Sequence, residues 1–254
     1  MSSGTEWKKT ITKKFPSALP VVPLVKAVYQ ALSDREFNSS NTLLANCFCR
    51  DEVNQSTAQL FEQTWGDAFN LTSLVGIPTA GYVGMNAYIS HAPDRGNLLI
   101  VFGPHIGVTA DGSIGRVLRK GVAKPSSSCG AIIHLIDKLK TGQALAKSVD
   151  IDNVELSAFE VLLSPYVGAS MEASEPLLSV TEAAYEIAYN RINDMLNVLK
   201  PENRIALLGG ILINTPVASG DYFDIRTAKI IEFGEGGRSD VSYHADLVDY
   251  GQSK

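Results

Sequence analysis

With 254 residues, of which 45% are hydrophobic, the chain is long enough to bury a core of its own. Its net charge of -5 argues against a protein built to neutralise phosphates, so nucleic acid is not expected as a partner. No apolar run approaches the roughly 20 residues that cross a bilayer. Three cysteines are too few for a disulfide framework and leave one unpaired, which fits a soluble protein of a reducing compartment.

The chain is expected to form one domain preceded by a short arm. Residues 1–19 contain a cluster of lysines and are predicted to be a solvated leader or N-terminal arm. Residues 20–250 contain no repeat and no linker, and they are predicted to fold as a single domain. Apolar side chains recur at helical spacing over residues 20–33, which predicts a helix. The compact apolar run 42–49 then predicts a buried strand that ends in charged residues.

The middle of the chain continues the alternation of helices and strands. Residues 55–65 predict a helix, and the glycine-rich stretch 76–84 predicts turns and loops. The buried run 97–104 is the best candidate for a central strand, and it delivers His105 at its carboxyl end. After it, PSSSCGAIIHLIDKLKTG predicts a helix that begins next to Cys129, where serines can cap free backbone N–H groups.

The last third predicts one long helix and two strands. The helix is expected from about Leu177 to Leu199, with Ser179 and Glu182 at capping-box spacing. Residues 204–215 predict another buried strand, and residues 221–233 an edge strand. The expected fold is therefore α/β, with a central parallel or mixed sheet flanked by helices. In such sheets ligands bind beyond the carboxyl ends of the strands.

Four residues from three separate elements could bind a soft or borderline metal ion: Cys47, Cys49, His105 and Cys129. Catalytic zinc sites use three protein ligands and leave the fourth position to water. Paired C-x-x-C motifs are absent from the sequence, which disfavours an autonomous zinc module.

The sequence leaves alternatives at each cysteine. A position at the start of a helix favours the thiolate of Cys129, although a small residue packed under a turn would fit the same pattern. Cys47 and Cys49 lie on the same face of a strand, so periodicity does not separate them. Cys49 is the preferred ligand because it is nearer the strand end and two residues before Asp51, and Cys47 is then a core residue.

Three segments carry a resemblance to a known family: CFCRDEVN at 47–54, FGPHIGVTADGSIGRVLRKG at 102–121, and SSSCGA at 126–131. Together they resemble the limiting-CO2-inducible protein B/C family, which is similar to β-carbonic anhydrases in fold and zinc site. The resemblance runs from about residue 20 to residue 245. It implies a β-carbonic-anhydrase-like fold, Zn²⁺ held by Cys49, His105 and Cys129, and Asp51 as the acidic partner beside the metal.

The resemblance also implies a homodimer that acts on CO2 and bicarbonate in inorganic-carbon handling. The expected location is the plastid stroma for a processed algal protein and the cytoplasm otherwise. The implied reaction is reversible hydration of CO2 by zinc-bound hydroxide. Two alternatives remain open: a non-catalytic zinc- or bicarbonate-binding component of a carbon-concentrating assembly, and a hydrolase in which Cys129 is the nucleophile and His105 the base.

The chain departs from the ordinary β-carbonic anhydrase pattern at two places. That pattern has an arginine two residues after the aspartate, to hold the carboxylate away from zinc, whereas this chain has Val53 there. The histidine and second cysteine are also farther apart, with Cys129 24 positions after His105. Another arginine must therefore orient Asp51. Arg116 is the first candidate and Arg50 the second.

Overall fold

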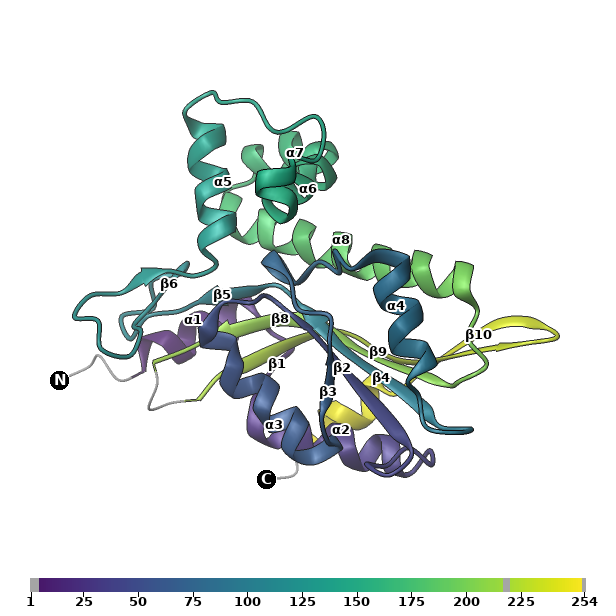
Figure 1. The fold of residues 1–254 in the computed structure, drawn as a ribbon. Helices are drawn as coiled ribbons and strands as arrows, with labels where there is room; N and C mark the ends of the chain where they lie inside the picture. The colour runs from purple at the N-terminus through teal and green to yellow at the C-terminus, as the bar shows by residue number, and fades with distance from the viewer. Residues whose placement is uncertain (1–4, 217–219, 253–254) are drawn as a thin grey trace.

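The computed structural model describes residues 5–216 and 220–252 (Figure 1). It has a mixed α/β fold around an eight-stranded sheet, in which the main strand order is β1-β9-β8-β4-β2-β3. Strand β5 also pairs with β8, and β10 also pairs with β9. The strands of this sheet are β1 (Ala18–Pro20), β2 (Thr42–Phe48), β3 (Ala68–Asn70), β4 (Asn97–Gly103), β5 (His105–Gly107), β8 (Ile205–Asn214), β9 (Tyr222–Gly234) and β10 (Gly237–Ser242).

One part of the sheet is parallel, and the strands of that part lead into the candidate ligand residues. Strands β3, β2, β4 and β8 are parallel neighbours, whereas β9 is antiparallel to β8. Every residue of β4 and β8 is buried, which explains their nearly continuous apolar sequences. Beyond Pro104, β5 carries the chain onward beside β8. The carboxyl ends of β2, β4 and β8 therefore meet at one edge of the sheet.

Helices cover both faces of the sheet (Figure 1). Helices α4 and α8 lie on one face, and α2, α3 and α9 on the other. Helices α5, α6 and α7 form a lobe above one end of α8. None of the described helices is long and apolar enough to cross a membrane. The helices are α1 (Glu6–Lys14), α2 (Val21–Ser33), α3 (Gln55–Trp65), α4 (Gly81–Ser90), α5 (Gly130–Lys140), α6 (Val154–Leu163), α7 (Val167–Glu172), α8 (Pro176–Leu199) and α9 (His244–Gln252).

Most predicted elements are confirmed, but the glycine-rich stretch 76–84, predicted as turns and loops, enters helix α4 at Gly81. Two details at the end of the chain are also wrong. The predicted edge strand, β9, is paired on both sides, with β8 along one side and with β1 and β10 along the other. Its alternating exposure reflects one solvated face, which does not reveal whether the strand's edges are paired. The predicted capping box also fails, because α8 begins at Pro176 and both Ser179 and Glu182 lie inside the helix.

The predicted solvated leader is also wrong for the residues that the structure describes. Trp7 and Ile11 lie one helical turn apart on α1, and with Phe15 they are buried in the core. The lysines of α1 lie on its outer side, which explains the charged sequence, and Lys14 forms an ion pair with Glu175. Residues 1–4 of the predicted leader lie outside the described residues. The following strand, β1, joins the sheet beside β9.

Candidate metal centre

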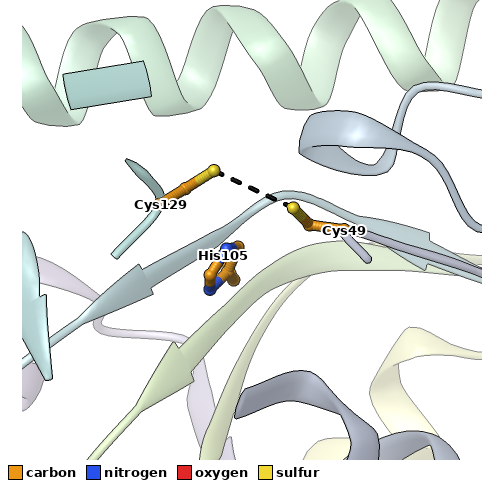
Figure 2. Close-up of side chains that lie close together, drawn as sticks. All are labelled: Cys49, His105 and Cys129. Atoms are coloured by element: carbon orange, nitrogen blue, oxygen red, sulfur yellow. Dashed lines mark hydrogen bonds between the residues drawn. The ribbon is translucent and has the colours of Figure 1, made fainter. Parts of the chain in front are cut away.

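Three of the four predicted ligand residues converge at the carboxyl edge of the sheet (Figure 2). Cys49 directly follows β2, His105 opens β5, and Cys129 precedes α5. Their ligand atoms all lie within 4.8 Å of one another, and the two sulfurs are 3.8 Å apart. The exposed fractions of these residues are 3%, 1% and 2%. This buried group could hold a metal ion.

The imidazole of His105 presents a free lone pair to the group. Its Nδ1 lies 2.7 Å from Oδ1 of Asn214, which can only accept a hydrogen bond. Nδ1 is therefore the protonated nitrogen, and Nε2 carries the lone pair. Nε2 is buried and has no hydrogen-bond partner. An unpartnered acceptor in such a place is costly unless a cation binds it.

The donor set and the sulfur separation both fit zinc. Two thiolates at the usual Zn–S distance of about 2.3 Å, with a tetrahedral angle between them, stand about 3.8 Å apart. The separation of the Cys49 and Cys129 sulfurs agrees with that value. Two cysteines and one histidine also form a three-ligand set that leaves one position open, as catalytic zinc sites do.

A tight turn supports the sulfur of Cys49. The backbone N–H of Val75 lies 3.3 Å from this sulfur, in a 3-10 turn spanning Leu74–Gly76. Val75 has a φ of 63°, which a β-branched residue rarely adopts, and this conformation directs its N–H to the sulfur. A Cβ at Gly76 would lie 2.3 Å from the Gly103 carbonyl oxygen, so only glycine fits there. The turn thus packs on the end of β4 and supplies a donor to the centre.

The two thiols have opposite pKa shifts because they share a proton. The hydrogen bond from Cys129, opposed by burial and aided by His105, lowers the pKa of Cys49 to about 4. The same contact with Cys49, together with burial, raises the pKa of Cys129 well above its ordinary value. The backbone N–H groups of Ala131 and Ile132 lower it less. The helix start therefore favours the Cys129 thiolate, as expected, but less strongly than Cys49 and burial oppose it, and a cation is needed to deprotonate both sulfurs.

The same contacts disfavour Cys129 as a nucleophile. A nucleophilic cysteine needs a lowered pKa and an adjacent base. The pKa of Cys129 is raised instead, and its sulfur contacts the sulfur of Cys49.

A carboxylate lies next to the three ligand residues and forms an ion pair with an arginine. Oδ2 of Asp51 is 3.7 Å from Nε2 of His105. Arg119 donates to the two carboxylate oxygens of Asp51 at 2.7 and 3.0 Å, the bidentate geometry of a strong ion pair. Burial raises the pKa of Asp51, but the contacts with Arg119, Glu52 and His105 together outweigh it and hold this pKa at about 2. Asp51 is thus an ionised hydrogen-bond acceptor at neutral pH.

Comparison with known proteins identifies the family. The model of the limiting CO2-inducible proteins B/C beta carbonic anhydrases matches residues 18–232. The chain belongs to this family. No curated protein sequence matches the chain.

Solved structures of this limiting CO2-inducible family share the fold. PtLCIB4, described as a homologue of the limiting CO2-inducible protein LCIB, is 29% identical to the chain, with a TM-score of 0.82. The match covers 92% of this chain and 98% of PtLCIB4. A variant of PtLCIB4 gives 28% identity, a TM-score of 0.83, and coverage of 93% and 98%. LCIB itself is 22% identical with a TM-score of 0.72, covers 91% of this chain and 96% of its own, and supports the fold alone.

The prediction that Arg116 or Arg50 orients Asp51 is wrong, because Arg119 is its partner. Arg116 donates to the carbonyl of Pro125 instead, and Arg50 forms an ion pair with Glu155. The short hairpin of β6 (Arg116–Val117) and β7 (Ser126–Ser127) holds Arg116 at its paired end. Arg119 lies in the loop between these strands and also donates to Ser126 and Ser127. Arg119 occurs in the same 102–121 segment as Arg116 but was missed as a candidate, because no spacing rule points to it.

The remaining cysteine and histidines lie outside the group of three. Cys47 is fully buried, its sulfur contacts the carbonyl of Gly76, and burial raises its pKa to about 12. His91 packs edge-on against Phe69. His134 is an exposed residue of α5, and His244 opens α9.

Two cavities of this chain lie beside the candidate metal centre, and neither is lined by all three ligand residues. One of about 680 Å³ is lined by Val53, Arg119, Asn214 and Asp221, among others. A second of about 400 Å³ is lined in part by Cys49 and Asp51. Asn214 was missed in the sequence because it ends a predicted strand and belongs to no recognisable motif.

Proposed function

We propose that this chain is a zinc-dependent carbonic anhydrase that interconverts CO2 and bicarbonate. One observation carries the proposal: the ligand atoms of Cys49, His105 and Cys129 lie within 4.8 Å of one another, beside an ionised Asp51. Membership of a family named for beta carbonic anhydrases supports the same activity.

Cys49, His105 and Cys129 would hold the zinc ion, two as thiolates and one as a neutral imidazole. When bound, Zn²⁺ lowers the pKa of a coordinated water from about 15.7 to about 7 and so supplies hydroxide at neutral pH. The protein's part is to direct the Nε2 lone pair at the ion, which the contact of Nδ1 with Asn214 does by holding the ring proton on Nδ1. Burial of the three side chains strengthens every charge interaction at the site.

Asp51 would accept a hydrogen bond from the nucleophile and so orient it toward CO2. Its pKa of about 2 keeps it an acceptor throughout the neutral range. Arg119 engages both carboxylate oxygens, which holds the carboxylate 3.7 Å from His105 Nε2 and keeps it from turning inward to bind the metal. An inward turn would fill the fourth ligand position and stop catalysis.

The decisive experiment is stopped-flow CO2 hydration with purified protein whose zinc content has been measured. We expect turnover in proportion to bound zinc and none from the Cys49→Ser variant. Zinc-loaded protein that does not accelerate hydration beyond the buffer rate would refute the proposal.

A second candidate function is metal binding without turnover, in a carbon-concentrating assembly. The burial of the ligands favours it, because neither cavity described above is lined by His105 or Cys129. The same measurements separate the two candidates. Stoichiometric zinc with no hydration activity would support the non-catalytic function.

We also propose that the chain forms a homodimer in its cellular role of inorganic-carbon handling. Val22 and Leu118, which line the 680 Å³ cavity, are 53% and 44% exposed, and such apolar surface is typical of an interface. Light scattering should give twice the mass of the chain, and Leu118→Glu should lower it. A monomeric mass at all concentrations would contradict this part of the proposal. Cell fractionation would test the plastid location.

A further inference from the structure

Asn214 contacts, directly or through one neighbour, all three segments that carry the candidate metal ligands. It is the last residue of β8, is 2% exposed, and lies opposite Gly107 of β5. We propose that Asn214 is a positioning residue, whose buried amide holds the three ligand-bearing segments in register for metal binding. This inference rests on the proposed zinc site.

The first contact orients His105. Oδ1 of Asn214 accepts from Nδ1 at 2.7 Å, the shortest contact that the amide makes. This contact selects the tautomer with the lone pair on Nε2 and fixes the plane of the ring. Without it, this buried N–H would keep only the longer contact with Oγ of Ser128, at 3.2 Å, and the ring would be held less firmly.

The second contact reaches Cys49. Nδ2 of Asn214 donates to Oδ1 of Asn54 at 3.1 Å, and the amide of Asn54 donates to the carbonyl of Cys49 at 2.9 Å. Asn54 is also 2% exposed, so water does not readily replace these bonds. The two amides therefore tie the end of β2 to the end of β8.

The third contact reaches the residue before Cys129. Oγ of Ser128 lies 3.3 Å from Oδ1 of Asn214 and 3.2 Å from Nδ1 of His105. Ser128 is fully buried. The loop that leads to Cys129 is thereby linked to the same amide.

Asp221 holds the amide in the required orientation. Its Oδ2 lies 3.4 Å from Nδ2 of Asn214, and its Oδ1 accepts from the backbone N–H of Thr215. Both acceptors, Asp221 and Asn54, lie on the Nδ2 side of the amide. A flipped amide would direct N–H groups at the N–H of His105 and oxygen at two acceptors, so one orientation satisfies the whole network.

The test measures metal affinity, which is separate from activity. Asn214→Leu is similar in size and removes every contact of the amide. We expect its zinc dissociation constant, from competition with a chromophoric chelator, to rise about 10- to 100-fold. The Co²⁺-substituted protein should show a shifted d–d absorption spectrum. Asn214→Asp restores an acceptor for His105, so it should recover part of this affinity.

A matched control separates positioning from general stability. Asn97 is a buried asparagine, 7% exposed, at the amino end of β4 and so at the opposite edge of the sheet. Asn97→Leu should lower thermal stability and leave the zinc affinity unchanged.

The outcomes decide between failure of this inference and failure of the zinc site. A folded Asn214→Leu protein with the parent's zinc affinity and Co²⁺ spectrum overturns the inference, as does an Asn214→Asp protein that binds as weakly as the leucine variant. Should Asn214→Leu fail to fold, Asn54→Asp, which cannot donate to the Cys49 carbonyl, carries the test, and unchanged affinity again overturns it. A parent protein that binds neither Zn²⁺ nor Co²⁺ refutes the zinc site itself.

Discussion

The two sides of the metal centre are built in different ways. On the sheet side, Cys49, His105 and Asn214 extend from the ends of strands and are at most 3% exposed. On the loop side, Cys129 and Arg119 come from the excursion between β5 and α5, and the side chain of Arg119 is 19% exposed. Strand ladders hold the first group, and side-chain contacts hold most of the second. The sheet therefore supplies a rigid set of ligands, while the loop sets the orientation of Asp51 and with it the proposed turnover.

The largest expected effect tests whether both sides are needed to bind the metal. Cys49→Ser, His105→Ala and Cys129→Ser each remove one of three ligands, so each should abolish stoichiometric zinc and reduce CO2 hydration to the buffer rate. Metal analysis of the purified variants and stopped-flow assays measure the two effects. Any of these variants that kept full zinc and full activity would remove its residue from the centre.

The next effect separates metal binding from turnover. Asp51→Ala removes the oriented acceptor and leaves all three ligands, so zinc content should stay stoichiometric while kcat falls about 100- to 1,000-fold. The steady-state hydration rate of zinc-quantified protein measures this. An unchanged kcat would show that Asp51 takes no part in the reaction.

A smaller effect tests the loop side alone. Arg119→Gln removes the paired hydrogen bonds that hold the carboxylate of Asp51. The kcat should fall about 10- to 100-fold, with zinc content unchanged. Arg116→Gln is the matched control, because this neighbouring arginine contacts the carbonyl of Pro125 and should keep the parent's kcat. Equal losses in the two variants would mean that a general change in the loop is responsible.

The smallest effect on the centre is expected on the sheet side. Cys47→Ser places a hydroxyl where the thiol now contacts Gly76, so stability should fall by about 1 to 3 kcal/mol. Zinc content and kcat should not change, because this sulfur lies outside the group of three ligands. Thermal unfolding and metal analysis check the two statements. Loss of zinc would place Cys47 at the metal.

Much of the fold was open to prediction because its signals are short-range. The apolar runs that became β2, β4 and β8 are recognisable from composition alone, since buried parallel strands are apolar on both faces. The spacing of Trp7 and Ile11 on α1 is equally local, yet the surrounding lysines hid it. The pairing of β9 on both sides depends on partners from distant parts of the chain, so its own pattern could not reveal it.

The candidate site divides in the same way. Residue type and position at strand ends pointed to Cys49 and His105, because a parallel sheet brings such ends together whatever the loops do. Cys129 was expected at the start of a helix, and the resemblance to the family implied that it joins them. The partner of Asp51 lies 68 residues away in sequence, and which of Arg116 and Arg119 reaches it depends on the path of one loop. The link from Asn214 to His105 spans 109 residues and joins two side chains that no common motif contains. Periodicity and composition act over a few residues, whereas a hydrogen bond between distant side chains exists only once the sheet and its loops have folded.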